Sequence, residues 1–323
     1  MPSYVIITPV RNEGPHFHQT IDSVLSQTIR PQAWIIVDDG STDITPQLID
    51  AAAARHPWIR AVRRTDRGFR KQGGGVIEAF YDGYAQLSTL TQLAAPPLPD
   101  PITPPLHYST PSWDFLVKLD GDLSFSADYF EECFKRFATA PQLGIGGGTI
   151  YCQVDGATIE DSPGDPSFHV RGATKIYRRA AWDAIGGLVR APGWDTLDEV
   201  KANMLGWKTC SFPDLRVFQL KPTGGADGCW KNWVKNGRAN YITGYHPLFM
   251  LLKCLKRILQ PPYGLAALGL LSGFCAGYLG RIPQVADPDL IRYLRRQQMN
   301  RLLGKQSLWT SPAMIPPLHS ANG

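Results

Sequence analysis

The chain has 323 residues, and 43% of them are apolar, which is enough to build a packed globular core. The formal net charge of +5, from 33 Lys and Arg against 28 Asp and Glu, is too small to indicate a nucleic-acid partner. The six cysteines form no C-x-x-C pair and none of the spacings of a zinc site, so we expect reduced thiols.

The N-terminal third of the chain alternates between strand and helix patterns. After the first β-branched run, apolar side chains recur at helical spacing at Ile21, Val24, Leu25 and Ile29. The expected strands cover residues 4–10, 33–37 and 58–63, and further expected helices cover residues 42–54 and 75–90. This alternation predicts an α/β fold with a mainly parallel central sheet flanked by helices.

Another strand is expected over residues 113–119, where the apolar run is continuous, as in a sheet covered on both faces. In open α/β sheets, ligands bind beyond the carboxyl ends of the strands. Three polar clusters follow strands in this way, at residues 8–13, 38–41 and 120–122. We therefore expect them to line one cleft.

The last cluster, Asp120-Gly121-Asp122, places two carboxylates one residue apart. Both can approach a hard divalent cation, and Mg²⁺ prefers oxygen ligands at about 2.1 Å and shares its shell with substrate phosphates. The same tripeptide is also ordinary turn composition. Taken alone, it leaves both interpretations open.

Five stretches together resemble the family-2 glycosyltransferases of the GT-A fold. VIITPVRNEG, IIVDDGSTD and FLVKLDGDLSF, in this order, resemble the nucleotide-sugar-binding half of that family. RGATKIYRRAAWDAIGGL and GWDTLDEVKANMLGW resemble its acceptor-side region and its base-bearing helix. The likeness covers residues 3–245. It implies a Rossmann-like GT-A domain over residues 1–245, followed by a C-terminal hydrophobic and amphipathic helical region over residues 246–323.

The resemblance implies that several side chains bind the donor, a nucleoside-diphosphate sugar. Asp39 matches the carboxylate that accepts a hydrogen bond from the nucleobase, and Asp120 matches a ribose or metal contact. Asp122 matches a direct ligand of a divalent cation, either Mg²⁺ or Mn²⁺. The other residues implied in donor binding are Pro9, Arg11, Glu13, Ser41, Arg70 and Lys71.

Most of these side chains have a structural alternative. Asp39 and Ser41 belong to the residue types preferred at helix N-caps. Glu13 could be an acid in the first turn of a helix, where the macrodipole favours it. Arg70 and Lys71 could be a solvated basic pair.

Sugar transfer also needs a base within reach of the acceptor hydroxyl, on the sugar face opposite the diphosphate. The resemblance places Asp195 at this position, with Glu199 and Asp198, one helical turn away, as alternatives. Asp195 or Thr196 could instead cap the helix, with Asp198 or Glu199 completing a capping box. Single displacement by the acceptor hydroxyl implies inversion of the anomeric centre.

The chain departs from the family pattern in two respects. After the base helix, where the family often has a histidine metal ligand, the sequence VFQLKPTGG has Leu220 and Lys221, so the third protein ligand is not identified. The Q-x-x-R-W sequence of processive synthases does not occur. We therefore expect the transfer of one sugar per encounter.

The C-terminal region is apolar and flanked by basic residues. Residues 258–280 contain no acid, and a helix over 262–280 would measure about 28 Å at about 1.5 Å per residue, close to the roughly 30 Å of a bilayer core. Gly269, Gly273 and Gly277 have the spacing that lets membrane helices approach closely. The pattern predicts membrane association, by a span or at the surface, and a buried helix is the alternative.

The function favoured by these features is that of a metal-dependent, inverting glycosyltransferase with a glycan or lipid-linked acceptor, acting in glycan, exopolysaccharide or glycolipid assembly. The start of the sequence, MPSYVIITPVRNEG, lacks the basic leader of a signal peptide, so the catalytic part is expected at the cytoplasmic face of a membrane. One alternative is a nucleotidyltransferase. Another is a membrane-tethered sugar-nucleotide-binding protein without catalysis.

Overall fold

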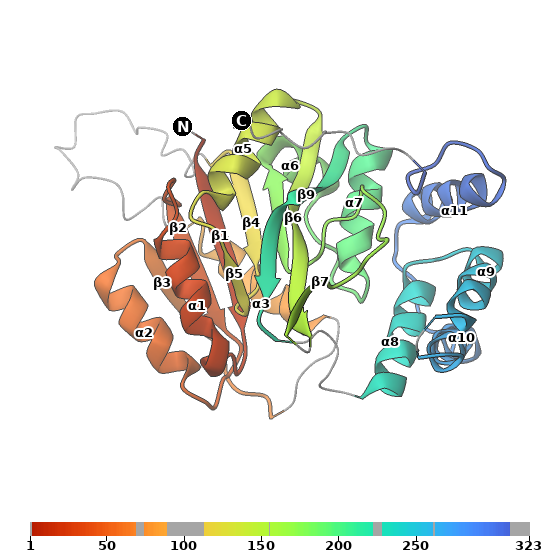
Figure 1. Ribbon diagram of the computed structural model, residues 1–323, viewed down its shortest axis with the longest axis horizontal. Coiled ribbons are helices and arrows are strands. Elements are labelled where there is room, and N and C mark those ends of the chain that lie inside the picture. Colours follow the sequence, from red (N-terminus) through yellow and green to blue (C-terminus); the bar gives the residue numbers. More distant parts are fainter. Residues whose placement is uncertain are drawn as a thin grey trace, which may run out of the picture.

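Figure 1 shows a computed structural model that describes residues 2–68, 74–88, 113–154, 156–221, 228–260 and 262–310. The strands in chain order are β1 (Tyr4–Val10), β2 (Ala33–Asp38), β3 (Ile59–Arg63), β4 (Phe115–Leu119), β5 (Leu123–Phe125), β6 (Leu143–Val154), β7 (Ala157–Glu160), β8 (Thr174–Arg178) and β9 (Lys208–Gln219). The helices are α1 (Gly14–Leu25), α2 (Thr45–Arg55), α3 (Gly75–Ala85), α5 (Tyr129–Thr139), α6 (Arg179–Ile185), α7 (Trp194–Met204), α8 (Cys229–Ile242), α9 (Pro247–Ile258), α10 (Leu265–Leu279) and α11 (Pro288–Leu302).

The strands in these ranges form one mixed sheet in the order β3-β2-β1-β4-β8-β6-β9-β5, with β7 paired to β6. Strands β3, β2, β1 and β4 are parallel neighbours. Strand β8 runs antiparallel to both β4 and β6, while β9 is parallel to β6. The predicted mainly parallel sheet is therefore correct for the first four strands and for the β6–β9 pair, and wrong for the antiparallel strands β5, β7 and β8. The βα alternation on which it rested ends after β4, and β8 enters between β4 and β6 in the opposite direction.

The predicted N-terminal elements are confirmed with small shifts of their bounds. Helix α1 ends at Leu25, so Ile29 lies beyond it and packs against the core from a loop. Helix α2 begins at Thr45, with Pro46 in its first turn, where the missing backbone N–H costs no helical hydrogen bond.

Two apolar cores lie on the two faces of the sheet, because successive side chains of a strand point to opposite faces. In β1, Tyr4 and Ile6 enter the core formed with α1, α2 and α5. Val5 and Ile7 enter the core formed with α3, α6 and α7. Every residue of β1 is buried, which matches a strand covered on both sides.

The C-terminal helices α8 to α11 form a third core beside α7 (Figure 1). Leu197 and Val200 of α7 are fully buried in it, together with Leu290 and Leu294 of α11. Helix α8, which precedes the predicted boundary at residue 245, packs along α10, which follows it. Helix α7 thus joins the sheet to the C-terminal helices.

The glycines of α10 make a close contact with α8 inside the protein. A Cβ atom added at Gly273 would lie 1.9 Å from the carbonyl oxygen of Val234, and one added at Gly237 would lie 2.0 Å from that of Leu270. Only glycine permits this approach of the two backbones. The glycine spacing that suggested membrane packing therefore makes a contact between helices of this chain.

Helix α10 is shorter than the expected helix over 262–280, and none of the helices within the described ranges is long and apolar enough to cross a bilayer.

Replacement of Gly273 by Ala should destabilise the protein by roughly 1–3 kcal/mol, the usual cost of forcing an extra carbon into a packed contact. The expected readout is a lower urea midpoint with an unchanged slope. Gly74→Ala is the matched control, because a Cβ atom there meets only the Arg190 carbonyl oxygen, at 4.0 Å. Equal midpoints for the two variants would contradict the close α8–α10 contact.

Candidate active site

The polar clusters that follow β1, β2 and β4 lie at one edge of the sheet. The strands are parallel neighbours, and Val10 at the end of β1 pairs with Asp38 at the end of β2. The loops that follow these strands therefore leave the sheet side by side. Contacts between their side chains, described next, connect the loops into one site.

Asp39, which follows β2, is buried and binds two arginines that follow β3. Arg64 Nη1 donates to Asp39 Oδ1 at 2.5 Å, and Arg67 donates to Oδ2. Arg11 donates to the Asp39 carbonyl oxygen at 2.5 Å and pairs with Asp66 at 2.7 Å. A carboxylate offers about four acceptor positions, so Asp39 keeps capacity for a further donor such as a nucleobase N–H.

Ser41 joins the loops after β1 and β2. Its hydroxyl oxygen accepts from the Asn12 backbone N–H at 2.9 Å, and its own N–H donates to Asp38 Oδ1 at 2.9 Å. The N-cap of α2 is Ile44, without a side-chain cap bond. The capping alternative for Asp39 and Ser41 is therefore wrong.

Of the three other residues predicted to bind the donor, the structure describes one. Pro9 is buried within β1, opposite Val37 of β2. Arg70 and Lys71 lie outside the described residues.

Glu13 lies on the other side of the cleft, close to the D-G-D loop. Lys221 Nζ pairs with its carboxylate at 3.2 Å. Burial raises the pKa of Glu13 to about 7, the Asp122 carboxylate adds to the shift, and Lys221 opposes it. Burial also raises the pKa of Asp122, with a further contribution from Asp120. Among the described residues, this end of the cleft thus has three carboxylates, those of Glu13, Asp120 and Asp122, against the two ammonium groups of Lys118 and Lys221.

The D-G-D loop is fixed on both sides. A Cβ atom at Gly121 would lie 2.5 Å from Val10 Cγ1, so glycine allows the loop to lie against β1. Gln219 Nε2 donates to Asp122 Oδ2 at 3.2 Å. Lys118 donates to the Asp120 carboxylate and, at 2.5 Å, to the carbonyl oxygen of Gly172.

Asp120 and Asp122 are the residues that could hold a divalent cation. Within the described part of the chain, no three His, Cys, Asp or Glu side chains come close enough to hold a metal ion by themselves. Two carboxylates, with further oxygens from a diphosphate, suit Mg²⁺ or Mn²⁺. The shortage of positive charge around Asp122 and Glu13 fits such a cation.

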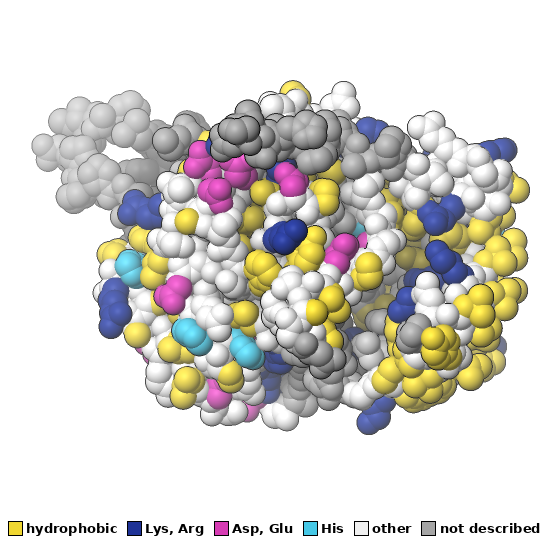
Figure 2. Space-filling model, viewed as in Figure 1, with side chains coloured by type: hydrophobic (Ala, Val, Ile, Leu, Met, Phe, Trp, Pro, Cys, Tyr) yellow, Lys and Arg dark blue, Asp and Glu magenta, His cyan; other side chains and the backbone are white. Residues whose placement is uncertain are grey.

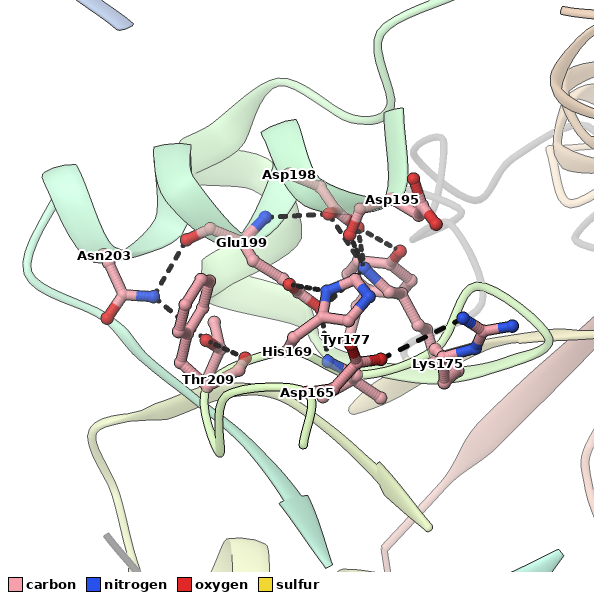
Figure 3. Close-up of polar contacts among 12 residues, drawn as sticks. Asp165, His169, Lys175, Tyr177, Asp195, Asp198, Glu199, Asn203 and Thr209 are labelled. Atoms are coloured by element: carbon pink, nitrogen blue, oxygen red, sulfur yellow. Dashed lines mark hydrogen bonds and ion pairs between the residues drawn. The ribbon is translucent and has the colours of Figure 1, made fainter. Parts of the chain in front are cut away.

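Asp195 lies in the first turn of α7 and is partly exposed. In Figure 3 its carboxylate points away from the buried polar network around Lys175. The N-cap of α7 is Gly193, which has a φ of 83° and makes no side-chain cap bond. The predicted capping box is therefore wrong, and Asp195 has no capping role.

Asp198 and Glu199, the alternative bases, are enclosed in the network drawn in Figure 3. Their exposed fractions are 2% and 0%. Lys175 Nζ lies 2.9 Å from Asp198 Oδ1 and 2.8 Å from Glu199 Oε1. Tyr177 donates to Asp198 at 2.6 Å, and His169 Nδ1 lies 2.8 Å from Glu199 Oε2. Both carboxylates therefore have a structural role in this network.

Lys175 also donates to the carbonyl oxygen of Asp195, so it fixes the first turn of α7 directly. Burial lowers the pKa of Lys175, but Asp198 and Glu199 outweigh this effect and raise it, which keeps the ammonium charged. Sequence reasoning missed this lysine. The signal was present, because a lysine within a buried strand such as TKIYR requires a partner.

Trp194 connects the D-G-D loop to the helix that carries Asp195. Lys118 Nζ and Lys175 Nζ lie 5.3 Å and 5.6 Å from the centroid of its ring. A Cβ atom at Gly172 would lie 3.2 Å from Asp195 Cβ, and the Gly172 carbonyl oxygen accepts from Lys118. Asp120 and Asp195 are thus connected through Lys118 and Gly172.

A pocket of about 200 Å³ lies near α7, between β6 and the loop that precedes β8. Sequence reasoning did not identify it. Residues that line it include Thr149, Glu160, Asp165, His169, Arg171 and Ser211. Because His169 also contacts Glu199, the pocket adjoins the network that supports α7.

Residues 5–80 match the family model described as Glycosyl transferase family 2. A comparison with curated protein sequences finds no match. The structure of GalNAc-T7 with UDP, GalNAc and Mn²⁺ is 14% identical, with a TM-score of 0.55 over 94% of this chain and 58% of that chain.

Two further solved structures are similar to the chain at lower TM-scores. The mannosyltransferase PcManGT from Pyrobaculum calidifontis, in complex with GDP-Man and Mn²⁺, has a TM-score of 0.48 at 16% identity, over 95% of this chain and 76% of that chain. TarS 1-349 of S. aureus with UDP-GlcNAc has a TM-score of 0.49 at 12% identity, over 94% and 80%.

The likeness to GalNAc-T7 concerns the fold, and the family match covers the segment that carries Asp39 and the loop after β1. The two findings agree with each other: residues 5–80 match glycosyltransferase family 2, and the fold of the chain is similar to that of GalNAc-T7, which indicates a glycosyltransferase with the GT-A fold.

Proposed function

We propose that the protein transfers one sugar from a nucleoside-diphosphate sugar to an acceptor hydroxyl, with inversion at the anomeric carbon and with the help of a divalent cation. Support for the proposal comes from the surroundings of Asp195. Its side chain lies next to Gly172, whose carbonyl oxygen accepts from the Lys118 that also holds Asp120, and its carboxylate stays outside the buried ion network. The nucleotidyltransferase alternative is set aside, because residues 5–80 match a glycosyltransferase family model.

The donor binds at the ends of β1, β2 and β4. Asp39 accepts from the nucleobase, and the arginines around it, Arg11 and Arg64, hold the loops in place through their contacts with this residue. Asp122 and Asp120 would hold the divalent cation, which would supply positive charge to neutralise the negative charge that grows on the diphosphate as it leaves. Lys221, which is 38% exposed beside Glu13, can pair with the same diphosphate.

Asp195 accepts the proton of the acceptor hydroxyl as its oxygen forms a bond to the anomeric carbon. The bond from that carbon to the diphosphate breaks, and its electron pair leaves with the diphosphate. Lys175 and the Trp194 ring hold the first turn of α7, so the base is positioned before the acceptor arrives.

The acceptor is a glycan or a lipid-linked saccharide, and the protein acts in polysaccharide or glycolipid assembly at the cytoplasmic face of a membrane. The hydroxyl, carboxylate and guanidinium groups of the pocket beside α7 support a hydroxyl-rich acceptor. Exposed leucines on α9 and α10 support the membrane.

Asp195→Asn should lower kcat by about 10²–10⁴-fold, the usual contribution of a general base, because the amide cannot accept the proton. Donor affinity should stay unchanged. The measurement is release of nucleoside diphosphate from a panel of nucleotide sugars, with donor binding followed by calorimetry. Asp183→Asn, which removes an exposed carboxylate of α6, is the matched control. Full activity of Asp195→Asn would contradict the assigned base.

Chelation of divalent cations by EDTA should abolish both transfer and the thermal stabilisation given by the donor, and Mn²⁺ or Mg²⁺ should restore them. In Asp122→Asn the cations should restore little, with kcat lower by roughly 10²–10³-fold, as when one group that stabilises developing charge is removed. Asp128→Asn, at the N-cap of α5, is the control. Donor stabilisation that persists in EDTA would disprove the role of Asp122.

The network that holds α7 should give the stability a defined pH dependence. Burial lowers the pKa of His169, but the Glu199 carboxylate outweighs it and raises that pKa above its ordinary value. The stabilisation is therefore complete below pH about 6.5 and is lost as the pH rises through the raised pKa.

His169→Gln should flatten this part of the curve of unfolding free energy against pH, measured with urea. His18→Gln, which removes a histidine from the exposed side of α1, controls for composition. Parallel curves for wild type and His169→Gln would show that the His169–Glu199 pair does not contribute.

A further inference from the structure

The C-terminal helices expose an unusual amount of apolar surface. Twelve of the nineteen large apolar side chains that are exposed among the described residues lie between positions 248 and 279. They are Leu248, Leu251, Leu252, Leu255, Ile258, Leu259, Tyr263, Leu265, Leu268, Leu271, Tyr278 and Leu279, which we call the C-terminal apolar face. Figure 2 shows this gathering of apolar side chains at the end of the molecule formed by α8 to α11.

The apolar face is a regular stripe on α9. Leu248, Leu251, Leu252, Leu255 and Leu259 recur at the spacing of one helix face. The opposite side of α9 is already used, because Phe249, Met250 and Cys254 are buried in the third core. The helix is therefore apolar on two sides, and within the described part of the chain it has a partner on only one of them.

Helix α10 continues the same face. Its glycine side is filled by α8, as the close approaches at Gly269 and Gly273 show. On its other side Leu268 and Leu279 are 61% and 86% exposed. Because α9 and α10 are in contact, their exposed apolar side chains belong to one surface.

The charged residues in the segment that carries the C-terminal apolar face are all basic. Residues 228–286 contain seven Lys and Arg residues and no Asp or Glu. They are Lys231, Lys235, Arg238, Lys253, Lys256, Arg257 and Arg281. The rest of the chain carries 26 Lys and Arg against 28 Asp and Glu, so the whole positive excess lies in this region.

We propose that the C-terminal apolar face binds the surface of an anionic lipid bilayer, with α9 lying in the plane of the interface. The leucine stripe enters the boundary between headgroups and acyl chains, and the cations beside it, such as Lys256, pair with lipid phosphates. This binding is peripheral and requires no helix that spans the membrane.

A second copy of the chain fits the C-terminal apolar face less well than an anionic bilayer does. In a two-fold dimer the same face would meet itself, so seven cations of each copy would approach without a carboxylate from this region to pair with them. An acidic protein partner fits the charge, but protein interfaces depend on Trp, Tyr and Arg anchors, in which leucine is under-represented. Nine of the twelve exposed side chains are leucines.

Helix α7 relates this surface to the cleft. Its Leu197 and Val200 are buried in the core that carries α9 and α10, while Asp195 in its first turn borders the cleft. Binding through α9 therefore holds the cleft at a fixed position relative to the bilayer. The inference rests on the membrane location in the proposed function and deepens it. It concerns a surface separate from the cleft, so it can fail while the proposed sugar transfer stands.

The test is flotation of the full chain with vesicles of phosphatidylcholine containing phosphatidylglycerol, and with vesicles of phosphatidylcholine alone. Wild type should float with the anionic vesicles, bind the neutral ones more weakly, and be released as the salt concentration rises. Leu251→Gln and Leu255→Gln should each weaken partition by about tenfold or more, the factor that corresponds to burial of one leucine side chain. Lys256→Gln should weaken binding to the anionic vesicles only.

Leu205→Gln and Lys208→Gln are the matched controls, because both side chains are exposed at the end of α7 and the start of β9. Urea midpoints should be equal for all variants, since every substituted side chain is exposed. Nucleoside diphosphate release in the absence of vesicles should also be unchanged. Unchanged release would show that the substitutions affect the C-terminal apolar face and leave the proposed sugar transfer intact.

Three results would overturn the inference. One is equal flotation of wild type and the leucine variants. Another is no flotation of wild type with anionic vesicles. The third is a concentration-dependent dimer, seen by sedimentation equilibrium, that Leu251→Gln abolishes, since the face would then be an interface between copies.

Discussion

The position of α7 depends on one buried ammonium group. Lys175 has no exposed side-chain surface, and it binds Asp198, Glu199 and the carbonyl oxygen of Asp195. Removing such charges from water costs several kcal/mol per ion, and only good geometry with further hydrogen bonds offsets it. Tyr177 and the Val170 N–H supply those bonds. The same contacts that satisfy the buried charges therefore fix the helix that presents Asp195.

This arrangement couples the two halves of the cleft. Lys118 holds the D-G-D loop through Asp120 and lies against the Trp194 ring, and Lys175 lies against the same ring. A cation over an indole face is attracted more strongly when it is removed from water. The donor side and the base side thus share Trp194 as a common support. A shift of either lysine would change both the loop and the helix.

Sequence reasoning succeeded where the signal was local. The strand ends that carry Asp39 and Asp122 follow from hydrophobic runs and from the geometry of parallel strands. It preferred Asp195 to Asp198 and Glu199 through the family resemblance alone, because helical spacing does not reveal that Lys175, on another strand, binds the latter two. The antiparallel entry of β8 likewise has no local signal. The glycines of α10 were misread because their partner, α8, lies before the expected domain boundary.

Helix α7 has two sides with different partners, and this gives the C-terminal helices a part in the active site. Its inner side faces the sheet through Trp194 and Ala202, and its outer side places Leu197 and Val200 in the third core. Those two side chains have no exposed surface and share the third core with residues of α9, α10 and α11, of which α11 contacts α7 directly. The helix that carries Asp195 is therefore held from both sides, by the Lys175 network and by the C-terminal helices. Helices α9 and α10 are apolar on two sides. One side packs in the core that also holds α7, and the other side remains exposed and can bind a partner.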